Sequence, residues 1–430
     1  MKPQLVLSAV LSLTSVLAFA SSTDQTITIQ VGSAQAGAGT AAAAIAASVA
    51  GPATVDASVM RSAPVLDADS LDLRQAGSVQ MEVFGMPLQV ARDELQVRSG
   101  GWTWEGSGED GSWLLLTSQE GRLAGTIDLV GREFEIAPQA DGSSLLLERD
   151  LTLLPPPGQP LVPELPPELP PVTGHPPPAE GDHALRSGVH WIDVMIVYTS
   201  NVQVEAGGHA GVAARAHNDV AWTNRAFMNT AMPVRFRLVA VKRMSLTEDP
   251  DMDDMLPATR GNSQVNNWRN QYGADMVGVY VSQGQYCGLG YVMRNPGPTF
   301  ERSAYQVTRF NCGAATYAHE HGHNMGMEHN PDNASASPSE ASYPWSFGHG
   351  VAAGGNSFRT IMAYAAVCNG DPCPRIRSFS ATGYIYNGIP IGVANSSENS
   401  RTGSLTAPVV AAFRPSVMLF QNGFDYGFID

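Results

Sequence analysis

The second half of the chain alternates between apolar runs of strand length and a longer stretch with helical periodicity. The strand-like runs are HWIDVMIVYT, VRFRLVAVKRM and ADMVGVYVSQ, and the first two flank residues 211–228, where apolar side chains recur at helical spacing. Strands that alternate with helices are typical of a mixed sheet built on crossover connections. The pattern predicts an α/β (α+β) domain with a twisted mixed sheet.

The first half shows a different pattern, in which short alternating segments are separated by Gly and Asp. MEVFGMPLQVAR and GWTWEGSGEDGSWLLLTSQEGRLAGTIDLV are examples, and this segment contains no cysteine. Such lengths and turn spacings indicate antiparallel β-structure. We therefore predict a small β-rich domain that begins at about residue 78.

A proline-rich stretch separates the two halves. Residues 154–186 include PPPGQPLVPELPPELPPVTGHPPP, which is too rich in proline for a core element and predicts an extended spacer. A chain of 430 residues also exceeds what one compact core usually holds. We expect folded parts at 21–153 and 187–415, followed by a C-terminal tail at 416–430 that packs on the second part or serves as a sorting segment.

The first twenty residues have the features of a signal peptide. Lys2 precedes an apolar run, and Ala18, Phe19 and Ala20 form a small-x-small cleavage site. The run is too short to span a bilayer comfortably. We predict export, a secreted protein, and no membrane span in the mature form.

The net charge of −15 belongs mainly to the first half. Residues 21–186 hold 22 acidic and 8 basic residues, whereas residues 187–430 hold 18 acidic and 16 basic ones. No basic patch indicates nucleic-acid binding. The acidic segment DPDMDDM, residues 249–255, is compatible with a calcium site, but a solvated surface loop is favoured.

Four cysteines allow three disulfide pairings once the chain is exported. The short interval between Cys368 and Cys373 suggests a turn closed on itself, which leaves Cys287 for Cys312. A zinc–thiolate cluster is the alternative, but the spacings are not those of such clusters.

The stretch HEHGHNMGMEH carries the candidate chemistry. His319 and His323 are four residues apart, which places both imidazoles on one helix face, and Glu320 lies beside them as a candidate base. Gly326 can end the helix in a left-handed conformation and so return the chain with His329 as a third ligand. Three protein ligands leave one position of a zinc ion open, as in catalytic sites. His321 falls on the opposite side of the helix, where packing is expected.

These residues match HExxHxxGxxH, and the chain thereby resembles the metzincin zinc peptidases. The segment RTIMAY further resembles the Met-turn of that clan, with Met362 beneath the metal. Across 189–414, CGLGY, RTIMAY and RIRSFS look most like the bacterial reprolysin-like branch, which is related to adamalysins. The resemblance implies a metzincin-like catalytic domain with one zinc ion on an active-site helix.

Two positions depart from the adamalysin pattern. Ile361 stands where adamalysins have a cysteine before the Met-turn methionine, and Cys368 follows it instead, so a disulfide scheme cannot be copied across. Tyr364, two residues after the methionine, is like a tyrosine that astacins and serralysins hold near the metal. It is a candidate hydrogen-bond donor to the oxyanion of the tetrahedral intermediate, and a structural role remains the alternative.

The resemblance implies a secreted zinc endopeptidase in which Glu320 takes a proton from water and passes it to the leaving amine. The protein or peptide substrate would lie along a strand edge, for which 287–292 is the candidate, beside a pocket walled by 365–367. The first half would be a propeptide that inhibits the enzyme and assists folding, released near Arg186. No cysteine precedes Cys287, so latency needs a carboxylate, a histidine or steric cover.

Two other function classes stay open at this point. One is a zinc-containing binding or adhesion module without turnover, although the full set of ligands and base argues against it. The other is a zinc amidase that acts on non-protein amides. We expect the protein to be a monomer.

Overall fold

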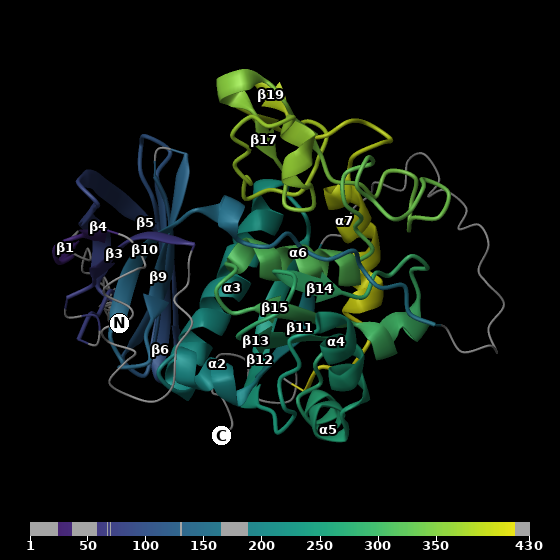
Figure 1. Cartoon of the computed structure of the whole chain (residues 1–430), viewed down its shortest axis with the longest axis horizontal. Coiled ribbons are helices and arrows are strands. Elements are labelled where there is room, and N and C mark those ends of the chain that lie inside the picture. Colours follow the sequence, from purple (N-terminus) through teal and green to yellow (C-terminus); the bar gives the residue numbers. More distant parts are fainter. Residues whose placement is uncertain are drawn as a thin grey trace, which may run out of the picture.

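The computed structural model describes residues 25–36, 58–66, 68, 70–129, 131–164 and 188–417. A large sheet from the first half stands beside a second sheet that carries most of the helices (Figure 1). The predicted signal peptide, the expected maturation site at Arg186 and the tail from residue 418 onward lie outside the described residues.

The N-terminal sheet is larger than the sequence pattern predicts. Its strand order is β1-β4-β5-β6-β7-β8-β9-β10-β3-β2, with only β1 and β4 parallel. It begins well before residue 78 because β1, β2 and β3 pair with its two edges. The strands are β1 Gln25–Ile29, β2 Gln35–Ala36, β3 Val59–Pro64, β4 Ala76–Val83, β5 Met86–Arg98, β6 Gly101–Ser107, β7 Trp113–Gln119, β8 Arg122–Leu129, β9 Arg132–Pro138 and β10 Ser144–Arg149.

The central strand β7 of this sheet is buried on both faces. Leu114 and Leu116 point into a core that belongs to the N-terminal sheet, whereas Trp113 and Leu115 join the core of the second half. Side chains alternate between the faces of a strand, so β7 contributes to two cores at once. The run of apolar residues in WLLL is explained by this double burial.

The second sheet confirms the mixed α/β prediction. Its order is β12-β11-β13-β15-β14, where β14 is the antiparallel edge strand and all other neighbours are parallel. The strands are β11 His190–Tyr198, β12 Val234–Arg243, β13 Met276–Val281, β14 Gly288–Gly290 and β15 Tyr305–Arg309. The helices are α2 Ser200–Glu205, α3 His209–Asn229, α4 Met252–Gly261, α5 Ser263–Gln271, α6 Ala314–Asn324 and α7 Asn399–Val410.

Short elements complete the fold. They are the pairs β16 Gly350–Val351 with β17 Phe358–Arg359 and β18 Ile385–Tyr386 with β19 Ile389–Pro390, and the 3-10 turns η1 Leu151–Leu153, η2 Pro298–Ser303, η3 Gly354–Asn356 and η4 Ala365–Cys368. Among the described residues, no helix is both long and apolar enough to cross a bilayer.

The acidic segment 249–255 is only partly a loop, because α4 begins at Met252. Asp251 caps this helix, its carboxylate accepting a hydrogen bond from the Asp253 amide at 2.9 Å, and it also accepts one from Gln285 Nε2. The Asp251 carboxylate therefore serves as the N-cap of α4. Within the described ranges, the one cluster with metal-ligand geometry lies elsewhere.

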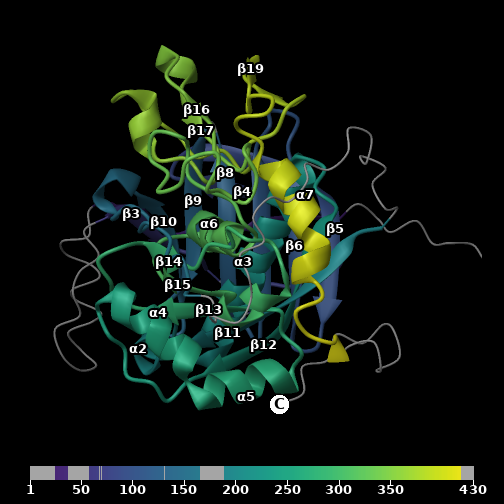
Figure 2. The same cartoon turned by 90° about the vertical axis from the view of Figure 1, so that its right-hand side faces the viewer.

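The beginning of the expected tail packs on the second sheet. The Arg414 amide donates to Asp275 Oδ1 at 2.9 Å, and Ser416 Oγ donates to Asp193 Oδ2 at 2.7 Å. Residues 411–417 thus run from α7, as the yellow chain below that helix in Figure 2, to the first half of β11.

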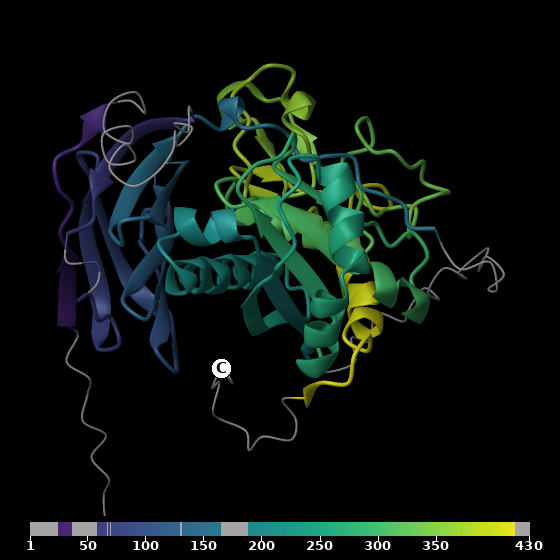
Figure 3. The ribbon, with the colours of Figure 1, turned by 60° about the horizontal axis from the view of Figure 1, so that its bottom comes forward.

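Helix α3 lies between the two sheets (Figures 1 and 3). On the side of the N-terminal sheet, Arg215 pairs with Glu135 and Arg225 pairs with Glu105. A further ion pair joins Arg377 to Asp128 across the same boundary. The N-terminal sheet is therefore held both by apolar burial and by charges against the second half.

Glu133, on β9, predicts a pH-dependent stability for the full-length chain. Burial, followed by the charge of Asp128, raises the pKa of Glu133 from its usual 4.5 to about 7, while Arg377 and Arg375 oppose the shift. The folded state then binds the proton more tightly than the unfolded state. Stability from this group is present below pH 4.5 and is lost as the pH rises to about 7.

We expect Glu133→Gln to remove this dependence, a difference on the order of 3 kcal/mol across the window. The measurement is urea unfolding of the uncleaved full-length chain from pH 4 to 8. Wild-type and variant curves that stay parallel would show that Glu133 titrates normally.

Candidate metal centre

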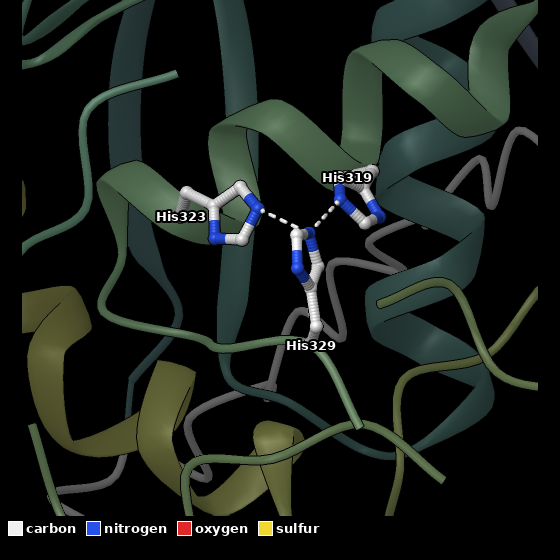
Figure 4. Close-up of side chains that lie close together, drawn as sticks. All are labelled: His319, His323 and His329. Carbon is white, nitrogen blue, oxygen red and sulfur yellow. Dashed lines mark hydrogen bonds between the residues drawn. The ribbon is translucent and has the colours of Figure 1, made fainter. Parts of the chain in front are cut away.

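All residues of the helix α6 except Ala315 are buried, and its faces make different contacts. Tyr317 and His321 face the core, with their rings 4.6 Å apart in an edge-to-face contact. His319 and His323 project from another face, one turn apart (Figure 4). His321 Nδ1 lies 3.1 Å from Asn324 Oδ1, which gives this histidine the packing role expected from its position.

Gly326 ends the helical path and turns the chain. Its φ is +85°, in the left-handed region that favours glycine. A Cβ atom at this position would also lie 2.4 Å from Ser342 Oγ, so neither the backbone angle nor the space suits another residue. The turn brings His329 back beneath α6.

The three predicted histidines converge on one point (Figure 4). His329 Nε2 lies 3.0 Å from the Nε2 atoms of both His319 and His323. The nearest nitrogens of all three fall within 4.8 Å of one another, and all three residues are buried. This spacing suits one ion with three nitrogen ligands.

The hydrogen bonds of the histidines fix which nitrogens are free to bind a metal. His319 Nδ1 donates to the Ile361 carbonyl at 2.8 Å and His323 Nδ1 donates to the Met327 carbonyl at 2.7 Å. Each Nε2 therefore carries a lone pair. Burial lowers the pKa of all three imidazoles, with repulsion among them adding to the effect for His319 and His329. Neutral rings whose lone pairs meet are a good fit to a cation such as zinc.

The carboxylate of Glu320 lies buried under the edge strand β14. A Cβ atom at Gly288 would be 2.6 Å from Glu320 Oε1, so the glycine leaves room for the carboxylate. Neither carboxylate oxygen has a hydrogen-bond partner among the described residues. Burial raises the pKa of Glu320 well above its usual value, and the charge of Arg375 counteracts this. A base without fixed partners is available to a water molecule.

Met362 and the residue before it support the site from below. The Ile361 carbonyl is the acceptor for His319 Nδ1, and Met362 Sδ would lie 2.6 Å from a Cβ atom at Gly322. Met362 is fully buried. This turn therefore orients the His319 imidazole and packs against α6 at Gly322.

Tyr364 lies at the rim of the histidine cluster. Its ring centroid is 4.3 Å from that of His329, and its hydroxyl donates to the carbonyls of Pro157 at 2.8 Å and Gly158 at 3.2 Å. Burial raises the pKa of Tyr364, so the phenol keeps its proton. The hydroxyl thus already binds peptide carbonyls beside the candidate metal site.

Those carbonyls belong to a cleft segment, residues 156–161, which the sequence pattern assigns to a spacer. Its backbone pairs with β14 and the residues flanking it. Cys287 donates to the Pro156 carbonyl, Gly158 to Gly288, Leu161 to Gly290 and Val292 to Leu161, at 2.8–3.1 Å. The segment runs parallel to the edge strand, and its path crosses α6 in Figure 1.

Both disulfides considered for the sequence are present. Cys287–Cys312 has an S–S distance of 1.97 Å and joins the entrance of β14 to the residues before α6. Cys368–Cys373, at 2.03 Å, closes the loop that follows η4. The first disulfide therefore ties β14, the strand over Glu320, to the start of the helix that carries the histidines.

Comparisons with known proteins agree with this geometry. Residues 189–380 match the Reprolysin_5 profile, described as metallo-peptidase family M12. The chain is 28% identical over 311 residues to a "Peptidyl-Asp metalloendopeptidase" of Xanthomonas campestris pv. campestris, covering 70% of this chain and 69% of the relative. A protein of the same name from Stenotrophomonas maltophilia (strain R551-3) is 26% identical over 366 residues, with 78% and 83% covered.

Among solved structures, metalloproteinase-II from Bacteroides fragilis matches with a TM-score of 0.36 and 11% identity, covering 62% of this chain and 85% of that one. The sequence-based resemblance to metzincin-like metallopeptidases is confirmed by the family match and the curated relatives.

Proposed function

We propose that this chain, which is a metzincin-like metallopeptidase of family M12, is a secreted zinc endopeptidase made as an inactive precursor. The observation that carries the proposal is the convergence of His319, His323 and His329 beside the unpartnered carboxylate of Glu320. The predicted signal peptide supports export, and we expect a monomer.

The three histidines would hold the metal through Nε2, and a bound zinc ion supplies Lewis-acid polarisation of a peptide carbonyl and acidifies water. Glu320 takes the proton from the attacking water and delivers it to the leaving amine. Tyr364 donates a hydrogen bond to the carbonyl oxygen as negative charge develops on it. Its observed bonds to two peptide carbonyls support this role.

The edge strand β14 would align an extended substrate. Once the cleft segment leaves, the amides of Cys287 and Val292 and the carbonyls of Gly288 and Gly290 are open to a new peptide backbone. A row of backbone groups suits a polypeptide and offers little to a small amide, so we favour the endopeptidase over the amidase. An adhesion module without turnover would not need a buried carboxylate without hydrogen-bond partners beside the histidines, so Glu320 also favours an enzyme.

The first half would act as a propeptide, and the cleft segment would be its inhibitory element. Pro157, Gly158 and Pro160 are buried where the segment crosses the site. The segment carries few backbone donors because it is proline-rich, and two of them, Gly158 and Leu161, are used on β14. Steric cover by main chain thus explains how latency can arise without a propeptide cysteine.

The curated relatives supply a hypothesis for the substrate. Both relatives described above carry the name "Peptidyl-Asp metalloendopeptidase". We propose the same preference for this chain, so that it cleaves proteins beside acidic residues. Cleavage of the spacer near Arg186 would begin maturation.

Metal removal tests the proposed function. The precursor is matured by limited trypsin treatment and assayed on casein with and without a chelator. We expect activity to fall at least about 100-fold on chelation and to return with one equivalent of zinc. The reason is that the proposed reaction depends on a single ion, for which the three histidines form one site. A matured, folded protein that binds one zinc and cleaves nothing would overturn the proposal.

A further inference from the structure

A cavity of about 450 Å³ lies across the boundary between the two halves of the chain. It is lined by residues 94–98 of β5, by residues 235–239 of β12, and by α3, which lies between the two sheets (Figure 3). The three histidines of the candidate metal centre and Glu320 are not among the lining residues. The cavity is therefore a feature of the uncleaved chain that is separate from the candidate catalytic site.

The cavity follows the edges of two strands. All five residues of each lining run border it, although neighbouring side chains on a strand point to opposite faces. β12 is an edge strand of its sheet, and β5 continues past its last pair with β4, Ala91 with Ser78. Asn224 of α3 already bonds the amide and the carbonyl of Phe236 on the outer side of β12. Such edges suit an extended peptide, which can add to a sheet through its backbone.

Two large apolar side chains are only partly covered in this cavity. Trp191 of β11 is 48% exposed and Val97 of β5 is 53% exposed, and both belong to the lining. They come from different halves of the chain. An occupant with aromatic or large aliphatic side chains would remove apolar surface of both halves from water.

The lining is cationic overall. Its charged members are four arginines and two glutamates, namely Glu94, Arg98, Glu105, Arg225, Arg235 and Arg237. Arg225 pairs with Glu105, and Arg237 pairs with Asp193. Within the described ranges, Arg98 and Arg235 donate only to neutral acceptors. Burial lowers the pKa of both guanidinium groups, to about 9 for Arg98. An acidic side chain in the cavity would give them a charged partner.

The described part of the chain ends beside this cavity. Arg237, one of the lining residues, donates from Nη2 to Ser416 Oγ at 2.7 Å. The tail segment, residues 418–430, then reads MLFQNGFDYGFID, with four aromatic residues, two aspartates and no lysine or arginine. Thirteen residues can span up to about 45 Å when extended, which exceeds the length of either lining run. The tail segment thus has the reach, the apolar side chains and the charge that the cavity calls for.

We propose that the tail segment binds in this cavity along the open edges of β5 and β12. Its aromatic side chains cover Trp191 and Val97, and its aspartates, Asp425 and Asp430, supply carboxylates to the cationic lining. The tail segment belongs to the second half and β5 to the first, so the bound segment holds the two halves of the uncleaved chain together. This role does not depend on peptidase activity.

The test measures the rate of thiol labelling of Val97→Cys in the full-length chain and in the same chain ended after Val417. All four native cysteines are in disulfides, so the introduced thiol is the only one that reacts. Val204→Cys, at a residue of α2 that is 69% exposed and lies outside the cavity, is the matched control. Gln96→Cys provides a second reporter on β5. Intact mass and thermal midpoint establish that each chain is uncleaved and folded.

We expect position 97 to react at least about tenfold faster without the tail segment, since each 1.4 kcal/mol of binding changes the free fraction by that factor. Position 96 should respond in the same direction, and position 204 should react equally in both chains. In the full-length chain, Asp425→Asn together with Asp430→Asn should speed labelling at position 97, because the carboxylates are lost while the side-chain shape is kept.

Equal rates at positions 96 and 97 with and without the tail segment would overturn the proposal. Slower labelling at higher protein concentration, in the shortened chain as well, would assign the cavity to a second copy of the chain instead. Protection of position 204 by the tail segment would show unspecific cover and would also overturn the proposal. A double Asn variant that labels as slowly as the parent would contradict the role given to the aspartates.

Discussion

Glu320→Gln is expected to lower kcat/KM on protein substrates by about 10³-fold or more, with one zinc still bound. Glutamine keeps the shape of the side chain and cannot take a proton. Both carboxylate oxygens lack partners, so the replacement breaks no described hydrogen bond. It also removes a buried carboxyl group whose charged form is disfavoured by burial, as its raised pKa shows, and thermal stability should be equal or higher.

The measurement pairs peptide cleavage with metal analysis of the matured variant. Glu328→Gln is a useful comparison, because Glu328 is also a buried glutamate near the histidines but pairs with Arg294. That variant should lose stability more than catalysis. Cleavage by Glu320→Gln at the wild-type rate would show that the base is another group.

Gly158→Val is expected to make the uncleaved precursor active. A Cβ atom at Gly158 would lie 2.8 Å from the Tyr286 ring and 3.0 Å from Leu289, so valine cannot fit between them. The cleft segment must then leave β14, and the hydrogen bonds of Tyr364 to this segment are lost with it. We expect precursor activity to rise at least about tenfold, since each 1.4 kcal/mol of lost cleft binding changes occupancy by that factor.

The assay uses a small peptide substrate and intact-mass analysis, which confirms that the chain is still uncleaved. Val162→Ala serves as the matched control, because Val162 is in the same stretch but is 54% exposed. Uncleaved Gly158→Val protein that stays as silent as wild type would argue that the segment does not cause latency.

The catalytic helix could be predicted because each residue of its motif has a chemical task tied to a fixed spacing. Two histidines four apart must share a helix face, and Gly326 must reach a φ that other residues avoid. The same holds for the second sheet, whose apolar runs appear in the sequence as strands. These properties depend on residues that are close together in the sequence, so the sequence pattern is sufficient to predict them.

The cleft segment could not be predicted in this way. The segment has the composition of a spacer, and only its backbone hydrogen bonds to β14, more than a hundred residues away in the sequence, fix its course. These are long-range contacts, and a pattern within a window of residues carries no such information.

If the proposed maturation releases the first half, the position of α3 between the sheets bears on the lifetime of the product. Trp113 and Leu115 of β7 complete the core on which α3 packs, and Glu135 neutralises its buried Arg215. Release of the N-terminal sheet would remove apolar and ionic contacts against which α3 of the second half packs. A matured enzyme would then persist through a slow unfolding rate, and once unfolded it would lack the surface that directs refolding.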